Sequence, residues 1–359
     1  MDPHSSVAPA GLADFRSDTV TRPTPAMYRA IAEAPLGDDT FRDDPTVLAL
    51  EEAAARLLGK EAALFLVSGT MANQVALRVH CQPGEEAIVD EASHVLNFEA
   101  GAAALPGIQM RPVQTEIGLY APEQLAQRLR RGNVHNPRTA LVCFENTNNG
   151  AGGVAFDDRQ TAPLAALARE LGAATHLDGA RIFNAQEVTG VPAAKLAAHM
   201  DSVSFCLSKG LGCPLGSMLC GSASFIERAR LWRQRMGGGL RQAGIVAACG
   251  LVALRDGFAH LAEDHRRTGA LAERLGALGT IDLLRRDGVR YTNMLYFSVN
   301  ARSRCSAPAL VEGCRRRGVL FYGDEKTMRM VCHRDVGDAH VARAVEAIAE
   351  ETGPDGAKE

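Results

Sequence analysis

From residue 62 to about residue 220, short apolar runs alternate with stretches that have helical periodicity, and this alternation most limits the folds open to the chain. Each run is short and bounded by small or turn-forming residues, which indicates a buried strand. The runs are Ala62–Val67, Ala87–Asp90, Ile108–Val113, Thr139–Phe144, Ala173–Leu177 and Ser202–Leu207, with a further candidate at Gly216–Cys220. Sustained alternation predicts an α/β fold with a largely parallel sheet, covered by helices on both faces.

The helices between these runs are marked by residues typical of helix ends. Asp44 and Pro45 open a helix that ends at Gly59, since Asp is a common N-cap and Pro fits the first turn. Further helices are expected at Met71–Cys81, from His94 to about Leu105, and at Glu123–Arg130, Ala162–Leu171 and Phe225–Met236.

Polar residues follow several of the runs at the point where each run ends. In sheets of this kind, ligands bind beyond the carboxyl ends of the strands. The residues expected along that one edge are Ser68, His94, Glu145, Asp178 and Lys209. Their convergence predicts a single site.

Two of these residues, Asp178 and Lys209, lie 31 positions apart at the ends of successive runs. Pyridoxal phosphate needs a lysine for its Schiff base and an acid that keeps its pyridine nitrogen protonated. The alternative is structural: Asp178 can be a helix N-cap, and Ser208-Lys209-Gly210 an ordinary turn. Ser68-Gly69-Thr70 lies between a run and a helix, where backbone N–H groups and a hydroxyl favour binding of a phosphate.

The length of the chain favours two domains. We expect residues 1–14 to be a disordered leader and residues 15–255 to form a large cofactor-binding domain that includes an N-terminal arm. Residues 256–359 are expected to form a small α+β domain, with strands near Met294–Val299 and Met328–Val331. Arg329 alternates with apolar neighbours there, so it faces either an anion or the solvent side of the sheet.

The composition is that of an ordinary globular protein, with a net charge of −3 that suggests neither a nucleic-acid nor a membrane-surface partner. The nine cysteines form no C-x-x-C pair, which favours a reducing cytoplasm over disulfides or a zinc site, and no metal is expected. Residues 1–11 show no secretory signal, and no apolar run approaches the roughly 18 residues of a membrane span.

Six motifs in this order resemble the low-specificity L-threonine aldolases, which are pyridoxal-phosphate enzymes of the β-eliminating lyase group. The resemblance covers Arg16 to about Val336. The motifs are Arg16-Ser17-Asp18-Thr19-Val20-Thr21, Ser68-Gly69-Thr70-Met71, Asp178-Gly179-Ala180-Arg181, Leu207-Ser208-Lys209-Gly210-Leu211-Gly212, Gly237-Gly238-Gly239-Leu240-Arg241-Gln242 and Met328-Arg329-Met330-Val331-Cys332-His333. The resemblance implies the fold type I of these enzymes, that of aspartate aminotransferase, with a seven-stranded sheet in the large domain.

The resemblance also implies a role for each matching residue. Lys209 would form the Schiff base, Asp178 would face the pyridine nitrogen, and His94 would stack on the ring and act in proton transfer. The phosphate would be bound by Ser68, Gly69 and Thr70, with Arg241 near it, from the same chain or across a subunit interface. The substrate carboxylate would be held by Ser17, Arg181 and Arg329, of which Arg181 also lies at the cofactor. His135 would be a second active-site histidine near the substrate hydroxyl.

The chain departs from the family pattern at Phe41-Arg42-Asp43-Asp44-Pro45, at Thr147-Asn148-Asn149 and at Asn136. The expected reaction is retro-aldol cleavage of threonine or allo-threonine to glycine and acetaldehyde, with His94, His135 or a water as the base. The alternatives are β-elimination, transamination, or a non-catalytic protein on the same scaffold. The resemblance further implies a homo-oligomer, a tetramer built as a dimer of dimers, with a small amino acid as its substrate.

Overall fold

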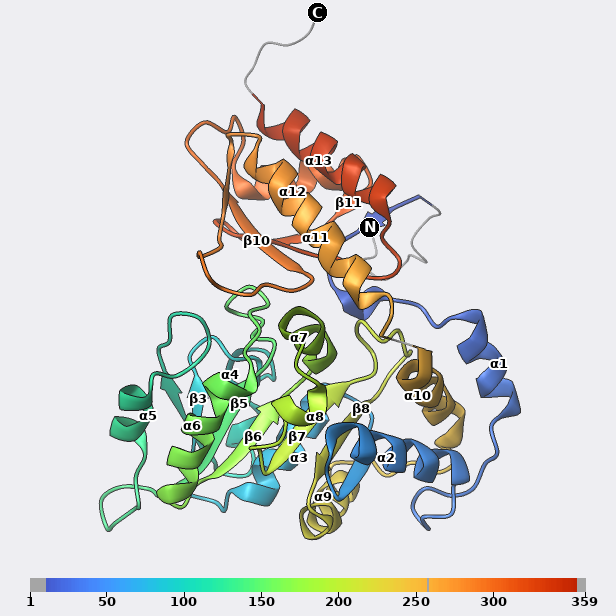
Figure 1. The fold of residues 1–359 in the computed structure, drawn as a ribbon, viewed down its shortest axis with the longest axis vertical. Coiled ribbons are helices and arrows are strands. Elements are labelled where there is room, and N and C mark those ends of the chain that lie inside the picture. Colours follow the sequence, from blue (N-terminus) through green and yellow to red (C-terminus); the bar gives the residue numbers. More distant parts are fainter. Residues whose placement is uncertain (1–10, 257, 354–359) are drawn as a thin grey trace, which may run out of the picture. The chain divides into compact units, whose positions relative to one another are not determined.

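The computed structural model describes residues 11–256 and 258–353, and the chain divides into two compact units (Figure 1). The small unit contains residues 11–21, 260–289 and 293–353. The large unit contains the rest of the described chain, including the short return segment Arg290–Thr292. Among the described residues, no single helix is long and apolar enough to cross a membrane. Only α10 (Gly244–Asp256) and α11 (Leu261–Gly276), counted together across the break between them, reach that length and composition.

The large unit is built on a seven-stranded sheet with the order β2-β8-β7-β6-β5-β3-β4. Every neighbouring pair is parallel except the two pairs made by β8, which runs against both β2 and β7. The strands are β2 (Ala62–Leu66), β3 (Glu86–Asp90), β4 (Gln109–Val113), β5 (Thr139–Glu145), β6 (Ala174–Asp178), β7 (Ser202–Cys206) and β8 (Ser217–Gly221). The predicted seven-stranded, mostly parallel sheet is therefore confirmed.

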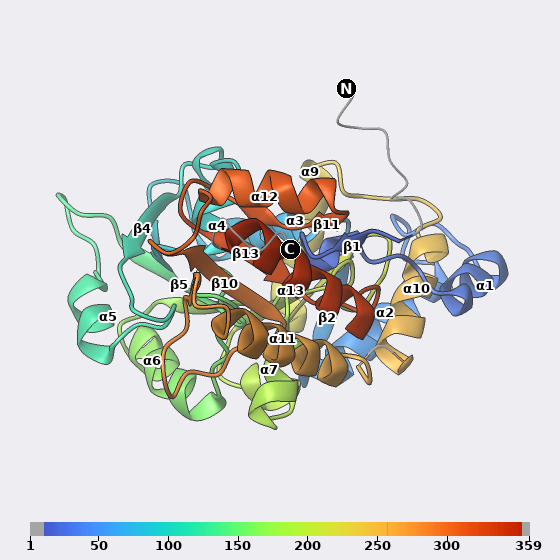
Figure 2. The same ribbon diagram turned by 90° about the horizontal axis from the view of Figure 1, so that it is seen from above.

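Helices cover both faces of this sheet, with α3 and α9 on one side and α6 and α7 on the other (Figure 2). Leu64 and Leu66 of β2 share one face of the strand and pack in a core with residues of α3 and α9. The helices are α1 (Pro25–Glu33), α2 (Pro45–Leu58), α3 (Gly69–His80), α4 (His94–Asn97), α5 (Pro122–Arg128), α6 (Asp158–Glu170), α7 (Ile182–Thr189), α8 (Ala193–Leu196), α9 (Ala223–Arg235) and α10 (Gly244–Asp256).

The ends of α2 follow the signals read from the sequence. The side chain of Asp44 accepts hydrogen bonds from the N–H groups of Thr46 and Val47, and Gly59 ends the helix at a φ of 62°. The helix expected from His94 to Leu105 is wrong in its length. It is replaced by the short α4 and a 3₁₀ turn at Ala102–Ala104, because Ala100 and Gly101 have φ values of 51° and 70° that interrupt a right-handed helix.

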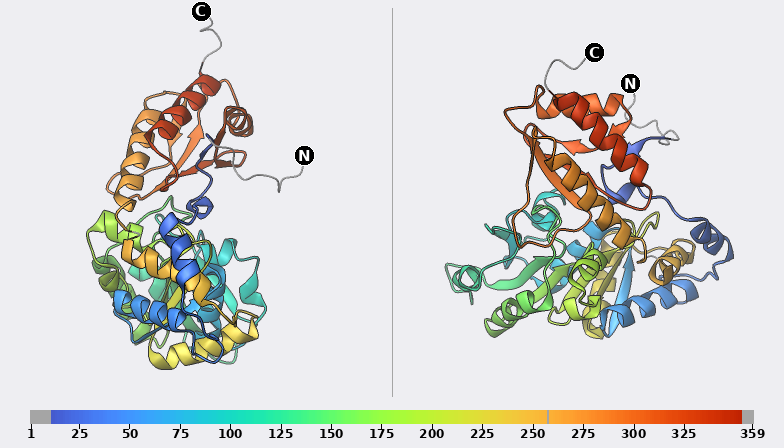
Figure 3. Two further views of the ribbon diagram at one scale, coloured as in Figure 1. Left: turned by 90° about the vertical axis from the view of Figure 1, so that its right-hand side faces the viewer. Right: turned by 45° about the horizontal axis from the view of Figure 1, so that its top comes forward.

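The small unit packs three helices on an antiparallel sheet with the order β12-β13-β10-β9 (Figure 3). Leu295, Phe297, Met328 and Met330 lie on one face of that sheet and form its core with apolar residues of the helices. The elements are β9 (Ile281–Leu283), β10 (Met294–Val299), β11 (Val319–Leu320), β12 (Tyr322–Gly323), β13 (Met328–Val331), α11 (Leu261–Gly276), α12 (Ala307–Arg316) and α13 (Asp338–Thr352).

The start of the described chain belongs to the small unit, which corrects two expectations. Strand β1 (Ala13–Asp14) pairs in parallel with β11, and the side chain of Phe15 is fully buried. Residues 15–21 of the arm therefore belong to the small unit, whereas the chain from Arg22 belongs to the large one. Residues 13–14 form a strand instead of a disordered leader, and residues 1–10 lie outside the described residues. The apolar side chains of Ala13 and Phe15 are buried in the core of the small unit, which explains why this segment pairs there. The later boundary, between residues 259 and 260, lies close to the expected one at 255 and 256.

Candidate active site

The residues expected at one edge of the large sheet do follow strands whose carboxyl ends meet there. Ser68 comes after β2, His94 after β3 and Lys209 after β7, and these strands all run in the same direction. Glu145 and Asp178 are the last residues of β5 and β6 and stand opposite each other in the register of that pair. The topology therefore brings these five residues to one edge.

Asp178 is a buried carboxylate whose orientation is fixed by two hydrogen bonds. Its Oδ2 accepts from the side-chain amide of Asn73 at 2.7 Å, and its Oδ1 accepts from the N–H of Ala180 at 3.0 Å. The residue after it must be small, because a Cβ on Gly179 would lie 2.7 Å from the carbonyl oxygen of Ser204 on β7. Only 6% of Asp178 is exposed, so its charge is partly desolvated and available to a group placed at the strand end.

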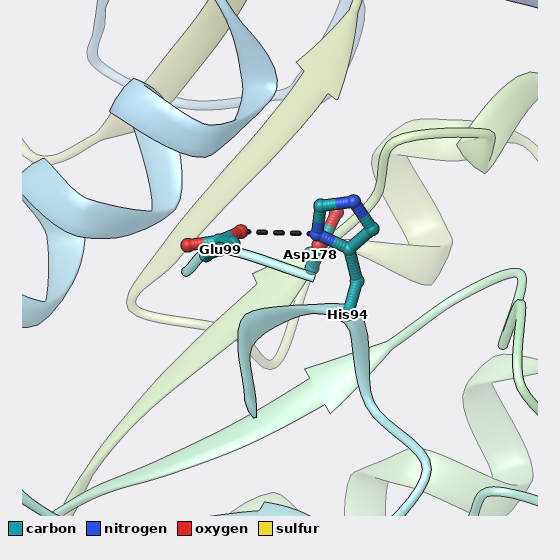
Figure 4. Close-up of side chains that lie close together, drawn as sticks. All are labelled: His94, Glu99 and Asp178. Atoms are coloured by element: carbon teal, nitrogen blue, oxygen red, sulfur yellow. Dashed lines mark hydrogen bonds and ion pairs between the residues drawn. The ribbon is translucent and has the colours of Figure 1, made fainter. Parts of the chain in front are cut away.

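His94 begins α4, and its imidazole lies beside Asp178 and Glu99 (Figure 4). Its Nδ1 is 3.1 Å from Oε1 of Glu99, whose carboxylate is buried, while 30% of the His94 side chain is exposed. The hydrogen bond to Glu99 raises the pKa of His94 and Asp178 raises it further, whereas burial and the charge of Lys209 lower it. Because Glu99 makes this imidazole more basic, His94 is suited to accept a proton near neutral pH.

Glu145 holds the backbone on which His94 is mounted. Its two oxygens accept hydrogen bonds from the N–H groups of His94, at 2.7 Å, and of Asn149, at 2.8 Å. Burial and the neighbouring Asp178 raise the pKa of Glu145 to about 7, against the opposing effect of these N–H donors. The strand end thus fixes the position of His94 through a side chain that is itself buried.

The start of α3 has the features of an anion site. The Oγ of Ser68 caps the helix by accepting from the N–H of Met71 at 3.1 Å, and residues 68–70 are half-buried. A Cβ on Gly69 would lie 2.8 Å from the sulfur of Cys206, at the end of β7, so the helix N-terminus packs directly against that strand. The N–H groups of a first helical turn have no partner within the helix and favour a phosphate there.

Lys209 is half-buried in the turn that follows β7, where its carbonyl oxygen accepts from the N–H of Gly212 at 2.8 Å. Its positive charge opposes protonation of His94, which places the two side chains in the same site. A primary amine, a carboxylate and a helix N-terminus on one sheet edge are the groups that pyridoxal phosphate requires, so the residues present fit this cofactor.

One atom each of His94, Glu99 and Asp178, all three of which can bind metals, lie within 4.8 Å of one another. The amide nitrogen of Asn73 lies between the two carboxylates, at 2.8 Å from Glu99 and 2.7 Å from Asp178. Two N–H donors thus occupy oxygen lone pairs that a cation would need, which makes these three residues a hydrogen-bonded cluster rather than a built metal site.

Two of the predicted residues do not lie with this cluster. His135 is exposed in the loop between α5 and β5, at the amino end of β5, which is the opposite edge of the sheet. Arg241 is also exposed and forms an ion pair with Asp38 at 3.2 Å. A resemblance between sequences does not tell whether a residue acts in the site of its own chain or in that of another copy. His135 and Arg241 therefore need not lie at the same sheet edge as Asp178 within one chain.

The three predicted carboxylate-binding residues are divided between the units. Arg181 is buried at the start of α7 in the large unit. Ser17 and Arg329 belong to the small unit, where the guanidinium of Arg329 donates to the carbonyl oxygen of Arg16 at 2.9 Å. Arg329 lies on the face of β13 opposite the apolar core and is half-buried, next to the ring of Tyr322.

Asn73 and Glu99 belong to the hydrogen-bonded cluster of the candidate site, and the sequence reasoning missed both. Both are almost fully buried, although they are polar and lie 105 and 79 positions before Asp178. A signal was present: Asn73 and Gln74 interrupt the apolar side of a helix that packs on the sheet, and a buried polar side chain needs a partner. Glu99 gave no comparable signal.

Comparison with known proteins places these residues in context. The model of a family described as beta-eliminating lyase matches residues 14–300. A low specificity L-threonine aldolase of Escherichia coli (strain K12) is 44% identical over 92% of this chain and 96% of its own, and low-specificity L-threonine aldolase 1 of Arabidopsis thaliana is 39% identical over 91% and 93%. The solved structure of a Leishmania major threonine aldolase has a TM-score of 0.80 at 19% identity, covering 94% of this chain and 98% of that one. The fold expected from the resemblance is confirmed.

Proposed function

Because the chain belongs to the β-eliminating lyase family, and its relatives include threonine aldolases, we propose that it cleaves L-threonine or L-allo-threonine to glycine and acetaldehyde with pyridoxal phosphate. The observation that carries this proposal is the cluster at the sheet edge, where Asp178 and the Glu99–His94 pair lie in the same site as Lys209. It supplies both a partner for a ring nitrogen and a basic imidazole.

Pyridoxal phosphate, when bound, takes up the electrons of a bond that breaks at the α-carbon of an amino acid. We assign Lys209 to hold it covalently and Asp178 to keep a proton on its pyridine nitrogen. The N-terminus of α3 at Ser68–Thr70 would bind its phosphate. Arg241 would join this phosphate site only from a second copy of the chain.

The amino acid itself would be held by its carboxylate, through Arg181, Ser17 and Arg329. An arginine suits this task because its planar fork pairs with both oxygens of a carboxylate. His94 would take the proton from the β-hydroxyl, because Glu99 makes its imidazole more basic. His135, at the opposite edge of its own sheet, would act only in the site of another copy.

We further propose a homo-oligomer, a dimer of dimers. Several large apolar side chains of the large unit are exposed around α1, α10 and the loop before α2, including Tyr28 (60%) and Phe41 (75%), with Leu36 and Ile245 near them. Exposed apolar residues gathered on one region favour contact with a partner. Sedimentation velocity of the loaded protein would test this, since a single monomeric species would contradict it.

We propose a cytoplasmic location, where thiols stay reduced. All nine cysteines lie within the described residues, where they form no disulfide, and eight of them are buried. Fractionation of cells would test the location, and recovery of the protein with secreted material would contradict it.

The reaction is tested by mixing the loaded protein with L-allo-threonine while following the visible absorption of the cofactor and the release of acetaldehyde. Acetaldehyde with a matching yield of glycine is the expected result, and Lys209→Ala should abolish both the visible band and turnover. Ammonia and a keto acid would indicate β-elimination instead, and dependence on a keto-acid acceptor would indicate transamination. No visible band after pyridoxal phosphate is supplied would refute the proposal.

A further inference from the structure

A buried chain of polar side chains runs between α3 and the strands β6 and β7, from Asp178 to His80. Its members are Asp178, Asn73, Ser204, His176, Ser202 and His80. Polar groups are rarely placed between a helix and a sheet unless their bonding is complete. Asn73 is the link that joins this chain to the candidate active site.

The side-chain amide of Asn73 makes four hydrogen bonds, which is its full capacity. Its nitrogen donates to Oδ2 of Asp178 at 2.7 Å and to Oε1 of Glu99 at 2.8 Å. Its oxygen accepts from Oγ of Ser204 at 3.0 Å and from Nε2 of His176 at 3.1 Å. Two carboxylates on one side can only accept, so the orientation of the amide is determined by its partners.

That orientation sets the direction of every other bond in the chain. Since the Asn73 oxygen accepts, His176 carries its proton on Nε2, and its Nδ1 accepts from Oγ of Ser202 at 2.9 Å. Oγ of Ser202 then accepts from Nε2 of His80 at 2.8 Å. Burial lowers the pKa of His176 to about 4 and that of His80 to about 3, so both imidazoles are neutral, as this pattern requires.

All donors in the chain therefore point toward the two carboxylates of the site. Hydrogen bonds that polarise one another in this way strengthen the last bond, here the one from Asn73. The carboxylates of Asp178 and Glu99 both accept from the same nitrogen of Asn73. One amide thus contacts the partner of the pyridine nitrogen and the partner of the His94 imidazole.

We propose that Asn73 is a positioning residue for the proposed reaction: it acts through Asp178 to hold the cofactor and through Glu99 to orient His94. This inference rests on the proposed function, because it assumes that pyridoxal phosphate binds against Asp178. Helix α3 would then contribute to the site in two ways: its first turn would bind the phosphate, and Asn73, one turn later, would position Asp178 and Glu99.

Removal of the amide group tests the assignment, with its neighbour as a matched control. Asn73→Leu removes the donors to both carboxylates. Gln74→Leu removes the bond from Gln74 to Oε2 of Glu99, at 2.7 Å, and the bond that Gln74 accepts from Arg78, also at 2.7 Å, but it leaves Asp178 untouched. Both positions are buried on the same helix. The dissociation constant of pyridoxal phosphate is measured with the apoprotein of each variant by equilibrium dialysis, after thermal melts have shown that it is folded.

Asn73→Leu is expected to weaken pyridoxal phosphate binding about tenfold or more, the scale of one hydrogen bond to a charged group. Gln74→Leu is expected to leave binding close to that of the unchanged protein. If Asn73→Leu does not fold, Asn73→Ser replaces it, since the smaller side chain can donate to only one of the two carboxylates. Equal binding by the Asn73 variant and the unchanged protein would overturn the inference.

A double-mutant cycle separates positioning from a general loss of packing. In an Asp178→Asn background, Asn73→Leu should add almost no further loss of affinity, because the residue through which it acts is already changed. The same penalty in both backgrounds would overturn the inference. Failure of the unchanged protein to bind pyridoxal phosphate would instead refute the proposed function, so the two failures are distinguishable.

Discussion

The half-buried His80 should make the large unit sensitive to acid, and replacing it by Phe should remove that part of the sensitivity. In the folded protein, burial lowers the pKa of His80 to about 3, from the ordinary value of 6.5. The unfolded chain therefore binds a proton at this residue below pH 6.5, while the folded chain does not. Stability from this residue is complete above pH 6.5 and is lost as the pH falls below it.

The size of the effect follows from these two values. A pH of 5 lies about 1.5 units below the pKa of His80 in the unfolded chain. At about 1.4 kcal/mol per unit, protonation of the unfolded chain at this residue lowers the free energy of unfolding by about 2 kcal/mol. In His80→Phe that loss is absent. In the unchanged protein the ring of His80 stacks on that of Phe225, with the two centroids 4.8 Å apart, and the Phe side chain of the variant can keep this contact. The variant loses the hydrogen bond between His80 and Ser202, which is worth about 1 kcal/mol.

His80→Phe is thus expected to be about 1 kcal/mol less stable than the unchanged protein at pH 7 and about 1 kcal/mol more stable at pH 5. Urea unfolding of both apoproteins at the two pH values measures this crossing. The quantity to compare is the difference in stability between the two proteins at each pH. Burial raises the pKa of Glu145 to about 7, which gives both proteins a stability that falls as the pH rises, opposite to the effect of His80. A difference in stability that is the same at pH 7 and pH 5 would refute the reasoning.

Three further substitutions test separate parts of the structure. Gly69→Ala places a Cβ 2.8 Å from the sulfur of Cys206, so the start of α3 must shift; we expect weaker binding of pyridoxal phosphate by dialysis, and unchanged affinity would contradict a phosphate site there. Asp39→Ala leaves the guanidinium of Arg233 buried without its partner at 2.8 Å, which should lower the free energy of unfolding by about 3–5 kcal/mol in urea; a loss below about 1 kcal/mol would show that the pair contributes little. Phe297→Ala opens a cavity in the core of the small unit and should cost about 3–5 kcal/mol, seen as faster hydrogen exchange in β10; unchanged exchange there would contradict that core.

The sheet and the residues at its edge were predictable because both depend on local patterns. Alternation of strands with helices specifies a parallel sheet, and a parallel sheet gathers strand ends, so Asp178 and Lys209 could be placed together from the sequence. The antiparallel direction of β8 had no local signal. It depends on how the chain returns between β7 and β2, which the pattern of β8 itself does not encode.

The hydrogen-bonded partners in the site were not predictable from local patterns. Asn73 and Asp178 are 105 positions apart, and the sequence around either residue does not indicate that the other is its hydrogen-bond partner. The helix predicted after His94 failed for a related reason. Its Ala-rich sequence favours a helix, but the buried bond from Glu99 to His94 and the turn at Ala100 and Gly101 override that propensity.

Strand β1 gives the order of synthesis a consequence for folding. Ala13 leaves the ribosome about 300 residues before its strand partner Val319. At a translation rate of about 5–20 residues per second, the N-terminal segment waits about 15–60 seconds for its strand partner. During that time the apolar ring of Phe15, which is fully buried in the finished protein, has no completed small unit to pack in. The large sheet is complete in sequence once Gly221 has been added, well before Val319. A chaperone that binds short apolar segments has its longest opportunity at this one.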